Sequence, residues 1–208
     1  MGSHDSLNQA EGAPRFWYRD NFFLTNDKSY LCPQTFNKSL DDNWWSSPLP
    51  QGQLQRVLDN CLTLAVYYTP QTAEEMKSKP TETQPILNSP FSNSDTGNGI
   101  AQPKDGSPHK MVGFARVVTD YVTLAYLTDV FVLEEFQRRG LASWLMKALK
   151  EIVDEWKHMR GLLLMTHDQA AARLYQRELG AQEFEKGPSA GLVMLEMAGP
   201  AEKPTPKH

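Results

Sequence analysis

The stretch from Asp129 to Ser143 combines residues that could bind a phosphate group through the backbone. An apolar run ends at Leu133, a short polar loop follows, and Gly140 opens a segment with the periodicity of an amphipathic helix. The first turn of a helix leaves N–H groups without acceptors at the positive end of the helix dipole, where an anion is stabilised. Gly140 lets the backbone turn and approach a ligand closely. The residues expected to bind the anion are Gln137, Arg138, Arg139, Gly140, Leu141, Ala142 and Ser143.

A second segment, from Leu162 to Gly180, also places a strand before a helix. Its apolar start predicts a buried strand, and Asp168 is expected to cap the helix that follows. Gly180 is expected to end that helix. One face of the helix would bury Ala171, Leu174, Tyr175 and Leu179.

The first turn has neither the three spaced glycines of a dinucleotide-binding loop nor the Gly-Lys-Ser/Thr of a Walker A loop. The spacing of Gln137, Gly140 and Ala142 instead resembles the Gln/Arg-x-x-Gly-x-Gly/Ala pyrophosphate loop of the GNAT acetyltransferase superfamily. The stretch from Gly113 to Tyr121 contains Ala-Arg-Val-Val-Thr-Asp and resembles a strand found in a bacterial and fungal branch of that superfamily. The resemblance does not supply a substrate for this branch.

The second segment is similar to a further GNAT motif, Asn-x-x-Ala-x-x-x-Tyr followed by Gly and an aromatic residue. Ala171 and Tyr175 are in register with it. Asp168 stands where Asn is usual, and Ala181 follows the glycine in place of an aromatic residue, so the cofactor contacts beside this helix are less well defined. The resemblance covers residues 20–184 apart from one insert.

This resemblance implies acetyl-CoA as cosubstrate and no metal ion. The turn would hold the pyrophosphate, while Val130, Phe131 and Val132 would hold the pantetheine arm by strand-like pairing. In the family the strands separate at this point, so the N–H of Val132 could donate to the thioester oxygen. Asp168 would lie beside the cofactor.

Acetyl transfer also needs groups that move protons. Tyr175 is the candidate general acid, because a phenol with an ordinary pKa of about 10 can protonate a departing thiolate. The same spacing fits a tyrosine that only fills the interface between helix and sheet. Asp129 is the candidate general base, since a carboxylate in an apolar strand needs a partner or a task. An ion pair with Arg116 would satisfy that need equally well.

Other titratable residues are weaker candidates for the base. Asp120 ends the preceding strand, Glu134 and Glu135 fit a solvated loop, and a single histidine at a strand end, such as His167, is typically structural. No Ser/His/Asp motif is present, and Cys61 lies on the core-facing stripe of an expected helix. A covalent acyl-enzyme is therefore not expected.

The hydrophobic periodicities predict an α/β (α+β) fold with a GNAT-like mixed, largely antiparallel central sheet flanked by helices on both faces. Strands are expected at Phe22–Thr25, Leu62–Tyr68, Met111–Val118 and Leu124–Leu133, from Leu162, and at Ala181–Phe184 and Leu192–Met197. Helices are expected at Gln53–Cys61, from Leu141 to about His158, and after Asp168. The buried stripe of the middle helix would comprise Leu141, Leu145, Leu149, Ile152, Val153 and Trp156.

The expected organisation is one domain over residues 16–199. Residues 1–15 are expected to be a flexible N-terminus that starts with a remnant of a purification tag, and residues 200–208 a flexible tail. Residues 70–110 are rich in Ser, Thr, Pro, Asn and Gly, which predicts a disordered insert.

Composition limits the partners and the compartment. The 208 residues contain no apolar run long enough to span a bilayer, and a net charge of -4 argues against a general nucleic-acid binder. Two cysteines provide neither a disulfide framework nor a metal-binding spacing, which favours a reducing compartment. A cytoplasmic location is therefore expected, with a nuclear one left open, and a dimer is also left open.

The expected function is transfer of an acetyl group from acetyl-CoA to a primary amine, within a ternary complex. The acceptor could be a small molecule or a protein amine, and a longer acyl group is left open. The alternative is a protein that binds or senses acetyl-CoA without turnover. Trp44, Trp45 and Tyr18 could line the acceptor site or simply pack against the body.

Overall fold

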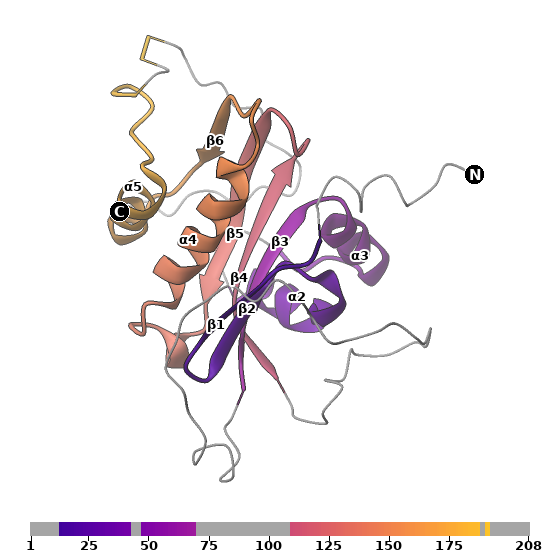
Figure 1. Ribbon diagram of the computed structural model, residues 1–208. Coiled ribbons are helices and arrows are strands. Elements are labelled where there is room, and N and C mark those ends of the chain that lie inside the picture. The colour runs from indigo at the N-terminus through magenta and orange to yellow at the C-terminus, as the bar shows by residue number, and fades with distance from the viewer. Residues whose placement is uncertain (1–12, 43–46, 70–108, 188–189, 192–208) are drawn as a thin grey trace, which may run out of the picture.

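A six-stranded sheet carries the fold in the computed structural model, which describes residues 13–42, 47–69, 109–187 and 190–191 (Figure 1). The strands are β1 (Phe16–Arg19), β2 (Phe22–Thr25), β3 (Leu62–Tyr68), β4 (Lys110–Thr119), β5 (Leu124–Val132) and β6 (Gly161–Leu164). The helices are α2 (Pro33–Asp41), α3 (Gln51–Asp59), α4 (Leu141–Asp154) and α5 (Gln169–Leu179), with short 3-10 turns η1 (Lys28–Tyr30) and η3 (Glu134–Phe136).

The strands follow their order in the sequence, from β1 to β6. Each of the first five pairs antiparallel with the next, and β6 pairs parallel with β5. A parallel neighbour requires a crossover connection, and α4 provides it. The expectation of a mixed, largely antiparallel sheet is confirmed.

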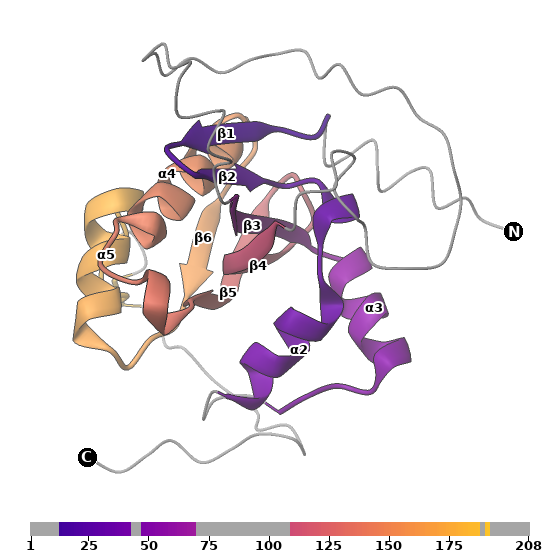
Figure 2. The ribbon, with the colours of Figure 1, turned by 90° about the horizontal axis from the view of Figure 1, so that it is seen from below.

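Helices cover both faces of the sheet, as expected. Figure 2 shows α4 and α5 on one face and α2 and α3 on the other. Two separate groups of buried side chains result, because the side chains of a strand alternate between faces. The α4 face buries, among others, Leu64, Val66, Val117, Leu145 and Leu149, and the α2–α3 face buries Phe36, Leu54, Leu58, Tyr67 and Phe114.

A β-bulge interrupts the pairing of β4 with β5 at Asp129. Phe114 pairs with Phe131 and Arg116 with Thr128, so β5 holds one residue more than β4 between these pairs. Asp129 accommodates it with a φ of 49°, in the left-handed region where Asp is enriched among non-glycine residues.

The bulge changes which residues of β5 face α4. Ala125 and Leu127 belong to the buried cluster on the α4 face. Val130 and Val132 are partly buried and pack against the same cluster, although an uninterrupted strand would turn them toward α2 and α3. On its other edge, β5 pairs with β6 only from Leu124 to Leu127. The end of β5 therefore has a paired edge toward β4 and an edge toward β6 that no strand of the described ranges occupies.

Several expected boundaries were wrong. The helix expected at Gln53–Cys61 begins at Gln51 and ends at Asp59, so Cys61 follows it. The helix that begins at Leu141 ends at Asp154, short of His158. Residues 181–184 form no strand, because a turn follows in which the N–H groups of Lys186 and Gly187 both donate to the carbonyl of Glu183.

Two elements were not anticipated, β1 and α2. β1 joins β2 through a tight turn in which Asp20 has a φ of 52°, and a two-residue Asp-Asn turn between aromatic strands was a readable signal. α2 starts with Pro33 in its first turn and buries Phe36 and Leu40, four residues apart. The Asp-Asn turn and the spacing of Phe36 and Leu40 each span only a few residues, which is too short to predict an element with the periodicities used.

The proposed tag remnant, nearly all of the expected insert, the strand expected at Leu192–Met197 and the C-terminal tail lie outside the described residues. Of the helices in the described ranges, none has the length and apolar character needed to cross a membrane.

Candidate functional site

The turn between β5 and α4 has the backbone of an anion site. Arg138 has a φ of 59° and Gly140 a φ of 72°, both in the left-handed region. Left-handed residues at such turns direct successive N–H groups into a concave arrangement that suits an anion. Gly140 is the N-cap of α4 and offers no side chain to occupy the N–H groups of the first turn.

These N–H groups have no acceptor among the described residues. The N–H of Trp144, which donates to the carbonyl of Gly140 at 3.1 Å, is the first one after the turn with a partner. Within the part of the chain that the structure describes, the N–H groups of residues 138–143 donate no hydrogen bond. The residues expected to bind an anion are therefore brought together, with six consecutive donors available.

The structure adds Arg19, which the sequence did not suggest. Its Nη2 donates to the carbonyl of Arg139 at 2.7 Å, and its Nη1 lies 3.4 Å from the carbonyl of Gly140. The guanidinium also lies over the ring of Trp144, 5.0 Å from the centroid. In a trans peptide the C=O and N–H point in opposite directions. Arg19 therefore fixes the orientation of the N–H groups of Gly140 and Leu141.

Further cations surround the turn. Arg138 and Arg139 are exposed, and Arg139 lies over the ring of Phe136. Arg177 of α5 donates to the hydroxyl of Ser143 at 2.9 Å, which ties the start of α4 to α5. The positive charge favours an anionic ligand.

The end of β5 directs one N–H group to its open edge. The N–H of Leu133 donates to the carbonyl of Val112 at 2.8 Å, and Val132 lies opposite Gly113. Since N–H groups alternate between the two edges of a strand, the N–H of Val132 points away from β4. Its carbonyl accepts from the side-chain amide of Gln137 at 3.0 Å. An extended ligand could therefore pair with Val130, Phe131 and Val132 along this edge.

Tyr175 lies on α5 and is buried in the α4 core, with 8% of its surface exposed. Burial raises the pKa of its phenol, and the negative charge of Asp168 raises it further, so the group is protonated at neutral pH. The hydroxyl has no hydrogen-bond partner among the described residues. Tyr175 therefore fills the helix–sheet interface and also retains an unused proton donor.

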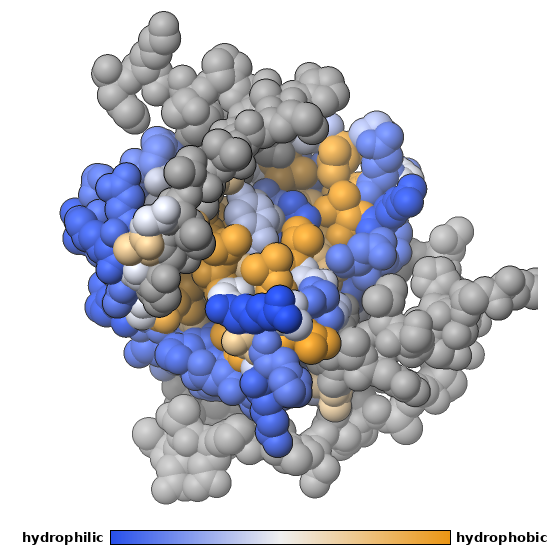
Figure 3. Space-filling view, turned by 90° about the horizontal axis from the view of Figure 1, so that it is seen from above, coloured by the Kyte–Doolittle hydropathy of each residue, from blue (hydrophilic) through white to orange (hydrophobic). Residues whose placement is uncertain are grey.

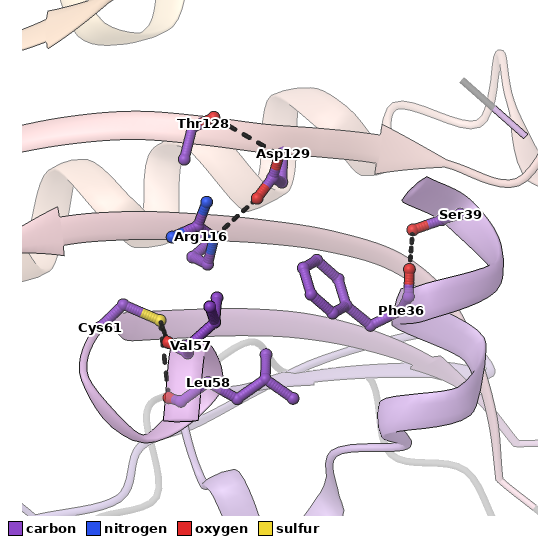
Figure 4. A network of polar contacts seen from close by, with 8 residues as sticks. All are labelled: Phe36, Ser39, Val57, Leu58, Cys61, Arg116, Thr128 and Asp129. Carbon is purple, nitrogen blue, oxygen red and sulfur yellow. Dashed lines mark hydrogen bonds and ion pairs between the residues drawn. The ribbon is translucent and has the colours of Figure 1, made fainter. Parts of the chain in front are cut away.

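Asp129 forms the ion pair with Arg116 that the sequence allowed. Its Oδ2 accepts from Nε at 2.6 Å, and the side chains of Arg116 and Asp129 are 19% and 9% exposed (Figure 4). The pair lies on the α2–α3 face, where Arg116 and Thr128 are opposite each other. A base role for Asp129 stays a prediction.

The remaining candidates have structural partners or are exposed. Asp168 caps α5 as expected, accepting from the N–H of Ala170 at 2.8 Å. Asp120 accepts from the hydroxyl of Thr123 and from three N–H groups of its own turn, which lowers its pKa well below the ordinary range. Glu134, Glu135 and His167 are exposed.

The aromatic residues suggested for the acceptor site are only partly described. Tyr18 lies on the edge strand β1, stacked beside Phe16, and is 59% exposed. Trp44 and Trp45 lie outside the described residues.

Two surface cavities accompany these groups. One, of about 400 Å³, is lined by Arg19, Phe22, Tyr68 and Arg139 among others and adjoins the turn before α4. The other, of about 550 Å³, lies between the end of α4, β6 and the end of α5, and none of the candidate site residues lines it. Within the described residues, His, Cys, Asp and Glu form no group of three that could hold a metal ion.

Comparisons with known proteins agree with this geometry. The model of the Acetyltransferase (GNAT) family matches residues 66–181. A Gibberella zeae protein named "Putative acetyltransferase FG08082" is 27% identical over 191 residues, which cover 89% of this chain and 95% of the relative.

Solved structures agree as well. A protein from Xanthomonas campestris pv. campestris, described as belonging to the GNAT family, is 26% identical with a TM-score of 0.57, over 88% of this chain and 97% of the other. The Staphylococcus aureus protein SA2161 shares the fold at 16% identity, with a TM-score of 0.51 over 85% of this chain and 99% of the other. The chain belongs to the GNAT acetyltransferase family.

Proposed function

We propose that this protein transfers the acetyl group of acetyl-CoA to a primary amine by direct transfer in a ternary complex. The observation that carries the proposal is the N–H of Val132, which points to the open edge of β5 close in sequence to six unpaired N–H groups at residues 138–143. A carbonyl oxygen that gains negative charge is stabilised by such a positioned donor. The diphosphate of the same molecule would lie at the start of α4.

Acetyl-CoA would bind along the end of β5. The turn at residues 138–143 would bind the pyrophosphate, with Arg19 holding two of its peptides in orientation. The amide groups of the pantetheine arm would pair with the open edge from Val130 to Val132, as a strand would. The acetyl group would then lie beside the N–H of Val132.

The transfer needs three proton movements, two away from the acceptor nitrogen and one to the sulfur. The acceptor ammonium would lose a proton to Asp129, directly or through a water molecule, and the nitrogen lone pair would then form a bond to the thioester carbon. The C–S bond breaks, and Tyr175 gives its proton to the departing thiolate. The nitrogen, which carries a positive charge once it is bonded to the thioester carbon, releases its second proton to solvent. Solvent also takes the proton from Asp129 and returns one to Tyr175. The products are an N-acetylated amine, CoA and one proton.

A second candidate is a protein that binds acetyl-CoA without turnover. It is favoured by the ion pair, because one oxygen of Asp129 is already engaged by Arg116 at 2.6 Å. A carboxylate that is already paired with arginine attracts the ammonium group of an acceptor less strongly than an unpaired carboxylate would.

Calorimetry and a CoA-release assay separate these functions. Titration with acetyl-CoA should show one site per chain, and a panel of small amines and peptides should reveal an acceptor that releases CoA. Asp129→Asn should lower turnover by about 10²–10⁴-fold with acetyl-CoA affinity kept, as expected for a positioned base. Tight binding with no release from any amine would favour the sensor, and absence of binding would refute both functions.

A further inference from the structure

The ion pair between Arg116 and Asp129 is only half satisfied. Nε of Arg116 uses Oδ2 of Asp129 at 2.6 Å, but the described residues offer no acceptor to either Nη atom. Oδ1 of Asp129 has only a contact of 3.5 Å with the hydroxyl of Thr128, which is long for a hydrogen bond. The guanidinium of Arg116 and the carboxylate of Asp129 therefore lie side by side, and each can still form hydrogen bonds with a ligand.

Both groups face a surface that a ligand could reach. The side chain of Arg116 is 19% exposed, and no buried side-chain nitrogen or oxygen of the described residues lacks a partner. α2 and α3 cover part of this face, where Phe36 packs against Phe114. Toward the start of β5 the same face is apolar and open, with Val118 44% and Leu163 38% exposed.

The figures agree with this arrangement. Figure 4 shows Arg116 and Asp129 turned toward each other from neighbouring strands, on the side where the Phe36 ring lies. Figure 3 views the end of the molecule that carries the start of β5 and shows hydrophobic side chains reaching the surface between hydrophilic ones.

We propose that the acceptor is a free α-amino acid with an apolar side chain. Its carboxylate would bind the Nη groups of Arg116, and its ammonium would bind Oδ1 of Asp129. The apolar side chain would lie on the surface formed by Val118, Leu124 and Leu163. This inference rests on the proposed acetyl transfer and names the substrate class for that site.

The charges favour this class over the other amines. A simple amine is a cation and would meet the unpaired side of Arg116 without offering it an acceptor. The N-terminus of a protein also lacks the required anion, because the carboxyl group of its first residue is part of a peptide bond. A zwitterion whose ammonium and carboxylate groups are attached to the same carbon matches the two adjacent groups. Arginine binds carboxylates through a planar pair of donors.

The position also suits the reaction. Asp129 directly precedes the strand end whose open edge is proposed to hold the thioester, so an amine bound at Asp129 would lie next to Val130–Val132. The group that holds the ammonium is then the group that removes its proton. The ion pair has a function under this proposal: Arg116 selects the acceptor and positions it for Asp129.

Calorimetry on the unaltered protein tests the proposal. L-leucine, L-leucinamide and 3-methylbutan-1-amine carry the same side chain, and only the first has a carboxylate. Each is titrated with and without saturating CoA. L-leucine should bind about 10- to 100-fold more tightly than the other two, the range expected for charge-assisted hydrogen bonds. Equal affinities, or no binding of L-leucine, would overturn the proposal.

Arg116→Lys provides the second measurement. Lysine can keep a charge beside Asp129 but loses the planar pair of donors. The dissociation constant for L-leucine should rise about tenfold, while those for acetyl-CoA and 3-methylbutan-1-amine stay unchanged. An equal loss for L-leucine and the amine would overturn the selective role of Arg116. Failure of acetyl-CoA to bind the unaltered protein would instead refute the proposed function, whereas the leucine series would still decide the acceptor class.

Discussion

Gly140→Asp should separate ligand binding from stability at the turn before α4. The residue lies in the left-handed region with a φ of 72°, and an added Cβ would meet only Nη1 of Arg19 at 3.5 Å, an ordinary contact. Asp accepts this backbone conformation more readily than most residues. A carboxylate at the start of a helix also stabilises it by about 0.3–1 kcal/mol, which offsets part of the strain. The melting temperature should therefore change little.

The same carboxylate should weaken acetyl-CoA binding strongly. It would lie among the N–H groups that the pyrophosphate requires, within roughly 4 Å of a phosphate oxygen. Two like charges at that separation repel by about 1 kcal/mol in water and about 4 kcal/mol near a protein surface. Gly140 is exposed, so the lower half of this range applies. A loss of about 1–2.5 kcal/mol corresponds to roughly 5- to 60-fold in affinity.

Gly180→Asp is the matched control. Gly180 has nearly the same backbone conformation, with a φ of 69°, and nothing lies within 4 Å of an added Cβ. It caps the C-terminal end of α5, where a negative charge is unfavourable. This variant should melt earlier and bind acetyl-CoA normally, the reverse of Gly140→Asp. If calorimetry finds unchanged affinity in folded Gly140→Asp, the phosphate is not bound at this turn.

Other changes test the remaining roles. Tyr175→Phe should lower turnover by about 10²–10⁴-fold and keep acetyl-CoA affinity, whereas a purely structural hydroxyl would leave turnover intact. Arg19→Met should weaken acetyl-CoA binding by roughly 5- to 10-fold, about the effect of one lost hydrogen bond, and spare S-acetylpantetheine, which has no phosphate. Replacing residues 70–108 by a short turn should preserve melting temperature and acetyl-CoA affinity, because the flanking ends of β3 and β4 are already paired; a loss of either would give the segment a role in the body or the site. Asp120→Asn should lower the melting temperature at neutral pH. Because the pKa of Asp120 is depressed on folding, this difference should shrink as the pH falls below about 5 and should vanish only below the depressed pKa of the folded protein. A difference that stays constant between about pH 5 and pH 2 would contradict the role of Asp120 in the turn.

Local features of the site were readable from the sequence because each depends on neighbouring residues. Asp168 caps α5 through a bond two residues away, and Gly180 ends that helix in the left-handed conformation. The turn that ends at Gly140 likewise follows from a strand, a polar loop and a helix in direct succession. Such features need no knowledge of how distant strands are aligned.

Contacts between distant segments could not be read in this way. Arg19 reaches the turn before α4 from a hairpin 120 residues earlier, and no local pattern marks it. The two interpretations of Asp129 also stayed open, because a choice between an ion pair and a free carboxylate requires the alignment of β4 with β5. The structure supplies that alignment, with Arg116 opposite Thr128.

The bulge at Asp129 links these observations. In a strand the side-chain face and the edge toward which the N–H points are coupled, so one extra residue reverses both. Without it, Val132 would point its N–H at β4 and its side chain at α2 and α3. With it, the N–H of Val132 turns to the open edge, and Asp129 is placed beside Arg116. The contacts on the α4 face show this reversal, since the residues that face α4 change from Ala125 and Leu127 to Val130 and Val132. A single left-handed residue therefore sets both the proposed donor for the thioester and the proposed site for the acceptor.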